Sequence, residues 1–206
     1  MNSNKILTEQ ESLNIINEMI SQTREYFQKG AANASIFWGY YIAAIALLNF
    51  ILLQIPDIAR YSYSVWFLTI PGIFVSVSIS RKKNILVKTH INTIINHIWI
   101  AFGISNVIFI GILYISATAV TIPALPIIIT PIILIMMGIA QYATAAACKF
   151  KLYVYSAMIF WTGALICALT YFTGRSDYQF IVMAVCMVAG FIIPGHILNS
   201  KAEKDV

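Results

Sequence analysis

Long apolar stretches that contain no charged residue make up most of the chain. They cover residues 30–56, 61–80, 89–148, 152–174 and 178–200. An α-helix rises about 1.5 Å per residue and the hydrocarbon core of a membrane is about 30 Å thick, so each stretch is long enough to cross a membrane. The third stretch is long enough for two crossings, and Pro123, Pro126 and Pro131 supply a break between them.

This pattern predicts an all-α integral membrane protein with six transmembrane helices. The expected spans are residues 33–55, 63–80, 95–117, 127–148, 152–172 and 178–198. Together they form one transmembrane domain over residues 31–200. A cytoplasmic amphipathic helix in residues 1–30 is expected before this domain, and a cytoplasmic tail of residues 201–206 after it.

Residues 8–29 carry the amphipathic pattern. When the residues are placed at about 100° intervals around a helix, Leu13, Ile16, Ile20 and Phe27 fall on one half of the cylinder and polar residues fill the other half. Such an apolar face is buried by the lipid interface, by the cytoplasmic ends of the spans or by a second protein. Because the polar half carries Glu rather than an excess of Lys and Arg, the pattern favours contact with protein over contact with anionic lipid.

Composition agrees with a membrane protein and argues against the soluble classes. Of the 206 residues, 60% are hydrophobic and 10% are charged, whereas soluble domains average about 45–50% and about 25%. So few charges cannot cover the surface of a soluble fold of this size. A soluble enzyme and a nucleic-acid-binding protein are therefore excluded.

The positions of the basic residues predict the orientation of the spans. With six spans, both chain ends and the loops near residues 81–90 and 149–151 share one side, which carries eleven Lys and Arg. The opposite side carries Arg60 and Arg175. Because cytoplasmic loops are enriched in Lys and Arg, both termini are expected in the cytoplasm.

Two pairs of triplets recur along the chain at the same offset of 123 residues. Residues 36–38 (IFW) repeat at 159–161, and residues 70–72 (IPG) repeat at 193–195. The first and third helical hairpins are therefore expected to be similar. We also expect kinks at Pro71-Gly72 and Pro194-Gly195, where each proline leaves a carbonyl without its helical donor and a neighbour, a Ser or Thr, or water must bind it.

The connection between the third and fourth spans, residues 118–130, is apolar and longer than two adjacent helices need. We hypothesise that this segment dips into the outer leaflet or caps a cavity.

The predicted spans contain no Asp, Glu, Lys or Arg. Ionisable residues inside a membrane usually mark ion pathways, voltage sensors or catalytic groups, so their absence argues against those functions. Cys148, Cys167 and Cys186 form no Cys-x-x-Cys pair and are interpreted as small packing residues. We therefore expect no catalytic residue, no metal site and no cofactor.

The candidate functional residues are neutral polar groups within the spans and histidines near their cytoplasmic ends. They are Asn106, Gln141, Thr144, His97 and His196. One interpretation is that these groups form hydrogen bonds between helices, each worth about 0.6–2 kcal/mol. The alternative is that they line a cavity for a small solute. Asn106 also belongs to a heptad-like series with Asn92, Asn96, Trp99 and Gly103.

Four segments together resemble a known group of proteins. They are residues 36–40 (IFWGY), 46–50 (ALLNF), 130–141 (TPIILIMMGIAQ) and 193–199 (IPGHILN). These segments are similar to those of uncharacterised small six-span inner-membrane proteins of Bacteroides-type bacteria, and the resemblance covers nearly the whole chain. It implies a bacterial inner-membrane location and supplies no catalytic or binding residues.

Two functions are compatible with these features. The first is a non-enzymatic regulatory or scaffold component that acts through the amphipathic helix and through helix-bundle contacts, as a homo-oligomer or with a cytoplasmic or membrane partner. The second is a small channel or carrier for a neutral or amphipathic solute. A lipid-modifying enzyme is a further alternative, but no acid, base or metal set can be named for it. The expected partners are the lipid bilayer and protein, not nucleic acid.

Overall fold

The computed structural model of the chain describes residues 10, 13, 32–82, 90–119 and 125–204. Every regular element within these ranges is helical. The predicted amphipathic helix lies outside the described residues apart from Gln10 and Leu13, which are helical and exposed. Its proposed contact face therefore stays a prediction.

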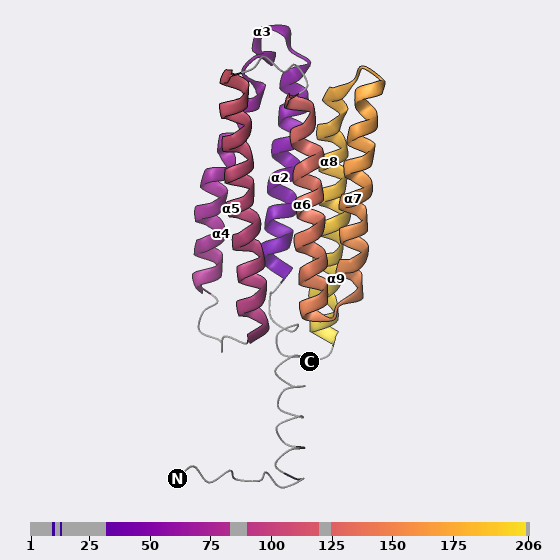
Figure 1. Ribbon diagram of the computed structural model, residues 1–206. Coiled ribbons are helices and arrows are strands. Elements are labelled where there is room, and N and C mark those ends of the chain that lie inside the picture. The colour runs from indigo at the N-terminus through magenta and orange to yellow at the C-terminus, as the bar shows by residue number, and fades with distance from the viewer. Residues whose placement is uncertain (1–9, 11–12, 14–31, 83–89, 120–124, 205–206) are drawn as a thin grey trace.

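The described helices lie side by side as an elongated bundle (Figure 1). In chain order they are α2 (Ala32–Leu53), α3 (Pro56–Ala59), the 3₁₀ helix η1 (Ser62–Leu68), α4 (Thr69–Lys82), α5 (His90–Ala119), α6 (Leu125–Cys148), α7 (Lys151–Phe172), the 3₁₀ helix η2 (Ser176–Tyr178), α8 (Gln179–Met187), the π-helix η3 (Val188–Ile192) and α9 (Ile193–Lys204).

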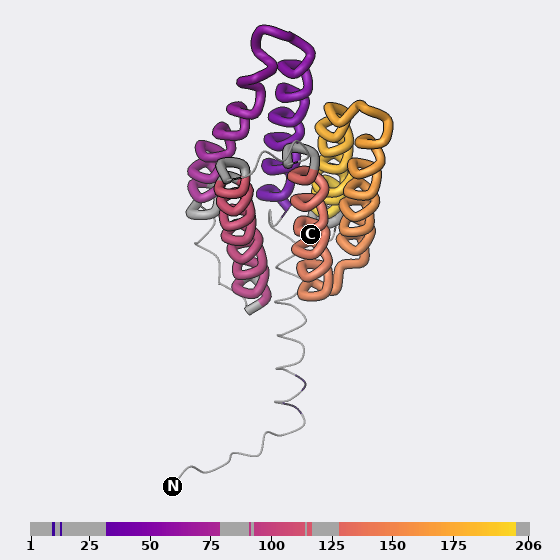
Figure 2. Tube along the Cα trace, turned by 45° about the horizontal axis from the view of Figure 1, so that its top comes forward, coloured from indigo at the N-terminus to yellow at the C-terminus, as the bar shows by residue number. Residues whose placement is uncertain are grey.

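The chain runs along the bundle in alternating directions, as α2, η1 with α4, α5, α6, α7, and α8 with η3 and α9. The start of α2 and the end of α9 consequently lie at the same end of the bundle (Figures 1 and 2). Five segments among the described residues are long and apolar enough to cross a membrane: Ala32–Leu53, Thr93–Leu113, Ile128–Cys148, Lys151–Phe172 and Ser176–Ser200. The remaining apolar segment, Ser62–Ser78, is shorter. The predictions of an all-helical fold and of several potential membrane spans are confirmed.

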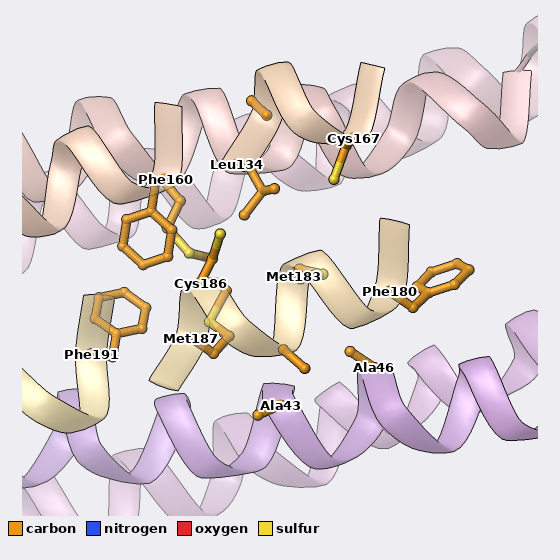
Figure 3. Close-up of a cluster of buried hydrophobic side chains, with 13 residues drawn as sticks. Ala43, Ala46, Leu134, Phe160, Cys167, Phe180, Met183, Cys186, Met187 and Phe191 are labelled. Atoms are coloured by element: carbon orange, nitrogen blue, oxygen red, sulfur yellow. The ribbon is translucent and has the colours of Figure 1, made fainter. Parts of the chain in front are cut away.

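Most of the buried apolar side chains form one cluster, which we call the main core, between α2, α6, α7 and the α8–η3 segment (Figure 3). Phe160 of α7 packs against Phe191 of η3 with ring centroids 5.0 Å apart. A Cβ atom on Gly190 would lie 2.6 Å from the Phe160 ring. Glycine is therefore what allows α7 and η3 to approach so closely.

A smaller cluster, the end core, lies at the end of the bundle where α2 begins and α9 ends. It consists of Ala32, Ala145, Tyr153 and Leu198, with partly buried apolar residues packed against them. Each of these four residues comes from a different helix, so the end core joins α2, α6, α7 and α9.

Helix α5 lies at the periphery of the bundle. It packs chiefly against α6, and Trp99 and Phe102 are the side chains that reach the main core. None of the residues in Thr93–Leu113 is buried, and a Cβ atom on Gly103 or Gly111 would meet nothing within 4 Å. The predicted heptad-like series therefore does not form a packed seam among the described helices, since Asn96 and Gly103 are exposed.

Helices extend into two segments that are expected to lie outside the spans, the connection of residues 118–130 and the tail of residues 201–206, and the membrane location of both segments stays a prediction. The connection expected over residues 118–130 is mostly helical, because α5 continues to Ala119 and α6 begins at Leu125, which leaves 120–124 outside the described residues. Pro126 lies in the first turn of α6, where its missing N–H has no helical partner to lose. The expected tail of residues 201–206 is also largely helical, since α9 runs to Lys204. Lys, Ala and Glu at its end are good helix formers.

Pro71 and Pro194, the prolines of the two repeated IPG triplets, each lie where one type of helix changes to another. Pro71 lies in the first turn of α4, directly after the 3₁₀ helix η1. Pro194 lies in the first turn of α9, directly after the π-helix η3. A 3₁₀ helix is wound more tightly than an α-helix, whereas a π-helix is wound more widely. The equivalent prolines therefore occur at junctions of opposite kind.

Candidate functional site

Three of the five predicted polar residues bond to their own helix. Asn106 Nδ2 donates to Phe102 O at 2.8 Å, and Thr144 Oγ1 donates to Ala140 O at 2.8 Å. His97 Nδ1 lies 2.7 Å from Thr93 O. Bonds to the carbonyl four residues earlier are common for such side chains within helices. These three groups are thus not brought together into one site.

His196 connects two helices. Its Nε2 atom lies 3.4 Å from the Tyr40 hydroxyl of α2. One turn further along α9, Asn199 Nδ2 donates to Asn33 Oδ1 of α2 at 2.9 Å. A Cβ atom on Gly195 would lie 2.5 Å from Ile36 of α2. Helices α2 and α9 therefore approach each other closely, and the exposed side of their interface is polar.

The junction at Pro71 is held by groups from two helices. Thr69 Oγ1 donates to Trp66 O at 2.7 Å, and the Tyr41 hydroxyl of α2 donates to Leu68 O at 2.6 Å. The sequence indicated that Ser, Thr or a neighbouring group would bind carbonyls here, but Tyr41 was not identified. A Cβ atom on Gly72 would lie 2.5 Å from the Tyr41 ring, so glycine leaves room for this tyrosine.

Asn49 of α2 is fully buried and is one of the buried polar residues that sequence reasoning missed. With its amide nitrogen facing Ser62, it donates to Ser62 O at 3.2 Å and to Ser62 Oγ at 3.3 Å, and its oxygen accepts from Trp66 Nε1 at 2.8 Å. This carboxamide joins α2 to η1. The available signal was an amide within the apolar run of residues 46–50.

The charged residues of η2 and its flank form a small network at the end of the bundle opposite to the end core. Arg175 forms an ion pair with Asp177 at 3.3 Å, and its guanidinium lies over the Tyr178 ring at 4.2 Å. Asp177 Oδ2 also accepts a hydrogen bond of 2.9 Å from Gln54 Nε2 at the end of α2. The hydrogen bond to Asp177 raises the pKa of Arg175. The network fastens the start of the last pass to α2.

Gln141 occupies the most unusual position of the predicted residues. It is 1% exposed, and its Nε2 atom is buried without a hydrogen-bond partner in the described part of the chain. On α6 it follows Met137 of the main core and precedes Ala145 of the end core. The amide therefore lies on a buried stripe between two apolar clusters.

The side chains of the three cysteines are packed inside the bundle. All three are buried free thiols. Cys167 Sγ donates to Gln179 O, and Cys186 Sγ donates to Ile159 O, each at 3.7 Å. Within the described ranges, no three His, Cys, Asp or Glu side chains are arranged to hold a metal ion.

In comparisons with known proteins, no family model, no curated protein and no solved structure matches this chain. The class of the protein is therefore defined by its fold alone. It is a helical-bundle protein with several helices that are long and apolar enough to span a membrane.

Proposed function

We propose that the chain crosses a bacterial inner membrane six times, with both termini in the cytoplasm. Five of these crossings are the long apolar segments. The additional crossing, which is the second in chain order, is the pass made by η1 and α4, which contain 7 and 14 residues. At about 2.0 Å per residue for a 3₁₀ helix and about 1.5 Å for an α-helix, the uncharged part of this pass, from residue 62 to residue 80, is about 32 Å long. This length exceeds the roughly 30 Å of a hydrocarbon core. The 3₁₀ segment thus compensates for the small number of residues.

The excess of basic residues on one side supports the orientation. Fusions of alkaline phosphatase and of a fluorescent protein test it. We expect phosphatase activity for fusions within residues 56–61 and 173–177, and fluorescence for fusions within residues 83–89 and after residue 206. Phosphatase activity within residues 83–89 would show that η1 and α4 do not cross.

Within this membrane, we assign the protein a non-enzymatic role as a regulatory or scaffold component that acts by contact with another copy or with a second protein. The observation that carries this proposal is helix α5, which is long enough to span but has no buried residue in Thr93–Leu113. Small residues at an exposed helix face allow a second helix to approach closely, and Gly103 and Gly111 have free space around them. The amphipathic helix is the second expected contact element.

The contact proposal is tested by deleting residues 1–29 and, separately, by the substitution Gly103→Leu. Oligomeric state is measured in lipid nanodiscs by mass photometry, and co-purifying proteins are measured by quantitative mass spectrometry. Ala168→Leu is the control, because it adds bulk to an exposed position of α7. We expect the deletion or Gly103→Leu to change the assembly and the control to leave it unchanged. If neither change alters oligomeric state or partners, the proposal is refuted.

A channel or carrier for a neutral solute is the second candidate function, and the buried amide of Gln141 favours it. Transport across a membrane requires polar groups that replace the hydration of the solute inside the bundle. Gln141 offers an N–H donor with no partner in the described part of the chain. Uptake of glycerol and urea into proteoliposomes, measured against protein-free liposomes, tests this function directly.

A further inference from the structure

The buried amide of Gln141 is energetically unusual. An N–H group that is buried without a partner is destabilising relative to a paired one, and inside a membrane there is little water to relieve the cost. Gln141 Nε2 is in this situation relative to the described residues. A side chain of similar volume without the amide, such as Leu, would avoid this cost. An acceptor for the N–H group would therefore explain why an amide stands at this position.

Buried polar side chains of two helices lie at about the same level along the bundle as Gln141. Helices α6 and α7 are antiparallel, with Gly138 against Trp161 and with Ala145 and Tyr153 in the same end core. This pairing brings Gln141 to about the level of Ser156, which is also fully buried. We call Gln141, Thr144 and Ser156 the polar layer. It separates the main core from the end core, and both of its hydroxyl residues come from the buried faces of their helices.

The hydroxyl groups of the polar layer leave acceptor capacity. Thr144 Oγ1 donates its hydrogen to Ala140 O at 2.8 Å, and Ser156 Oγ donates its hydrogen to Leu152 O at 3.2 Å. A hydroxyl oxygen carries two lone pairs in addition to its hydrogen. The layer therefore combines an unused N–H donor with hydroxyl acceptors.

The polar layer contains no charged side chain. An ion buried without a partner costs far more than a hydrogen-bonded neutral group. A molecule bound here is therefore expected to be uncharged, to accept a hydrogen bond from the amide and to donate one to a hydroxyl oxygen. A hydroxyl or a primary amide meets these requirements, and so does water.

We propose that the polar layer binds one small uncharged molecule, water or a hydroxyl- or amide-bearing solute, through the Nε2 group of Gln141. The inference deepens the second candidate function, because a bound solute would be the transported one. It does not depend on transport, since a water held permanently between the two cores would occupy the same donors and acceptors.

The experiment uses the full chain, labelled with ¹⁵N in glutamine side chains and embedded in lipid nanodiscs. The NH₂ signal of Gln141 is assigned by its loss in Gln141→Leu, or in Gln141→Asn if the first variant does not fold. Magnetisation transfer to this NH₂ group is measured from water, from ¹³C-glycerol and from ¹³C-urea. Gln179 is the internal control, because it is equally buried but its unpaired atom is the acceptor Oε1.

We expect a contact from at least one of the three molecules to Gln141 that is at least tenfold stronger than the contact to Gln179. Contact from water alone supports the site and refutes a carrier function for glycerol and urea. Contact from glycerol or urea supports both, and Thr144→Val should then weaken it. If Gln141 receives no transfer from water, glycerol or urea, the proposed site is refuted, whatever the liposome uptake shows.

Discussion

The sharpest prediction concerns Asn49, because a single buried carboxamide joins two segments of the bundle. In Asn49→Leu, a side chain of nearly the same size replaces the amide, so little cavity forms. Trp66 Nε1 loses its acceptor at 2.8 Å, and Ser62 loses a donor to both its carbonyl and its hydroxyl oxygen. The substitution therefore removes hydrogen bonds while largely preserving packing.

The magnitude follows from these lost bonds. A hydrogen bond contributes a net of about 0.5–1.5 kcal/mol, and leaving a partner unsatisfied raises the cost to about 1–3 kcal/mol. We expect Asn49→Leu to lower the free energy of unfolding by about 2 kcal/mol, which reduces the folded-to-unfolded ratio roughly 30-fold.

Reversible unfolding by sodium dodecyl sulfate in mixed micelles, followed by tryptophan fluorescence and circular dichroism, measures this change. Asn106→Leu is the matched control, because the Asn106 amide is half-buried and bonds only to its own helix. We expect the control to change stability by less than about 0.5 kcal/mol. Combining Asn49→Leu with Trp66→Phe should recover at least about 0.5 kcal/mol relative to additivity. Equal effects of Asn49→Leu and Asn106→Leu, or strict additivity with Trp66→Phe, would refute the reasoning.

Three further predictions use the same unfolding assay or chemical labelling. Gly190→Ala should cost about 1–3 kcal/mol, because its Cβ would lie 2.6 Å from the Phe160 ring. Gly103→Ala should be neutral or stabilising by up to about 1 kcal/mol, since the site is open. If Gly103→Ala were more destabilising than Gly190→Ala, the result would contradict the close packing of η3 against Phe160. Tyr41→Phe should lose about 0.5–1.5 kcal/mol with its 2.6 Å bond, and Tyr40→Phe should lose less because its contact is 3.4 Å long. Equal losses for the two tyrosines would argue against a specific role at the Pro71 junction. Maleimide should modify Cys148, Cys167 and Cys186 at least tenfold more slowly in the folded protein than after unfolding, because all three are buried. Rapid labelling of the folded protein would contradict that burial.

The candidate residues show where reasoning from sequence fails. Asn106 and Gln141 are both amides in apolar spans, and the sequence ranks them alike. The structure separates them, because α5 lies at the edge of the bundle and α6 lies within it. Asn49 was overlooked for the same reason, since its burial depends on η1 folding back against α2. In a uniformly apolar helix, periodicity does not distinguish the side that faces lipid from the side that faces protein.

The proline junctions show a related failure. The sequence placed Pro71 and Pro194 in equivalent triplets and predicted equivalent kinks. The structure has a 3₁₀ helix before one and a π-helix before the other. Tyr41 packs against Gly72 at the first junction, whereas Phe191 and Ile192 of the π-helix pack around Gly39 before the second. The neighbours of each junction, rather than the proline itself, differ between the two hairpins.

The sequence by itself determined the helical class, the apolar segments and their approximate boundaries. It could do so because the length and hydropathy of a span are local properties that the thickness of a membrane selects. Only the tertiary structure decided which polar groups are buried, which helix is peripheral and where two apolar cores leave a polar layer around Gln141. These features depend on contacts between helices that lie far apart in the chain, and apolar helices of similar composition carry little information about which of their faces will meet.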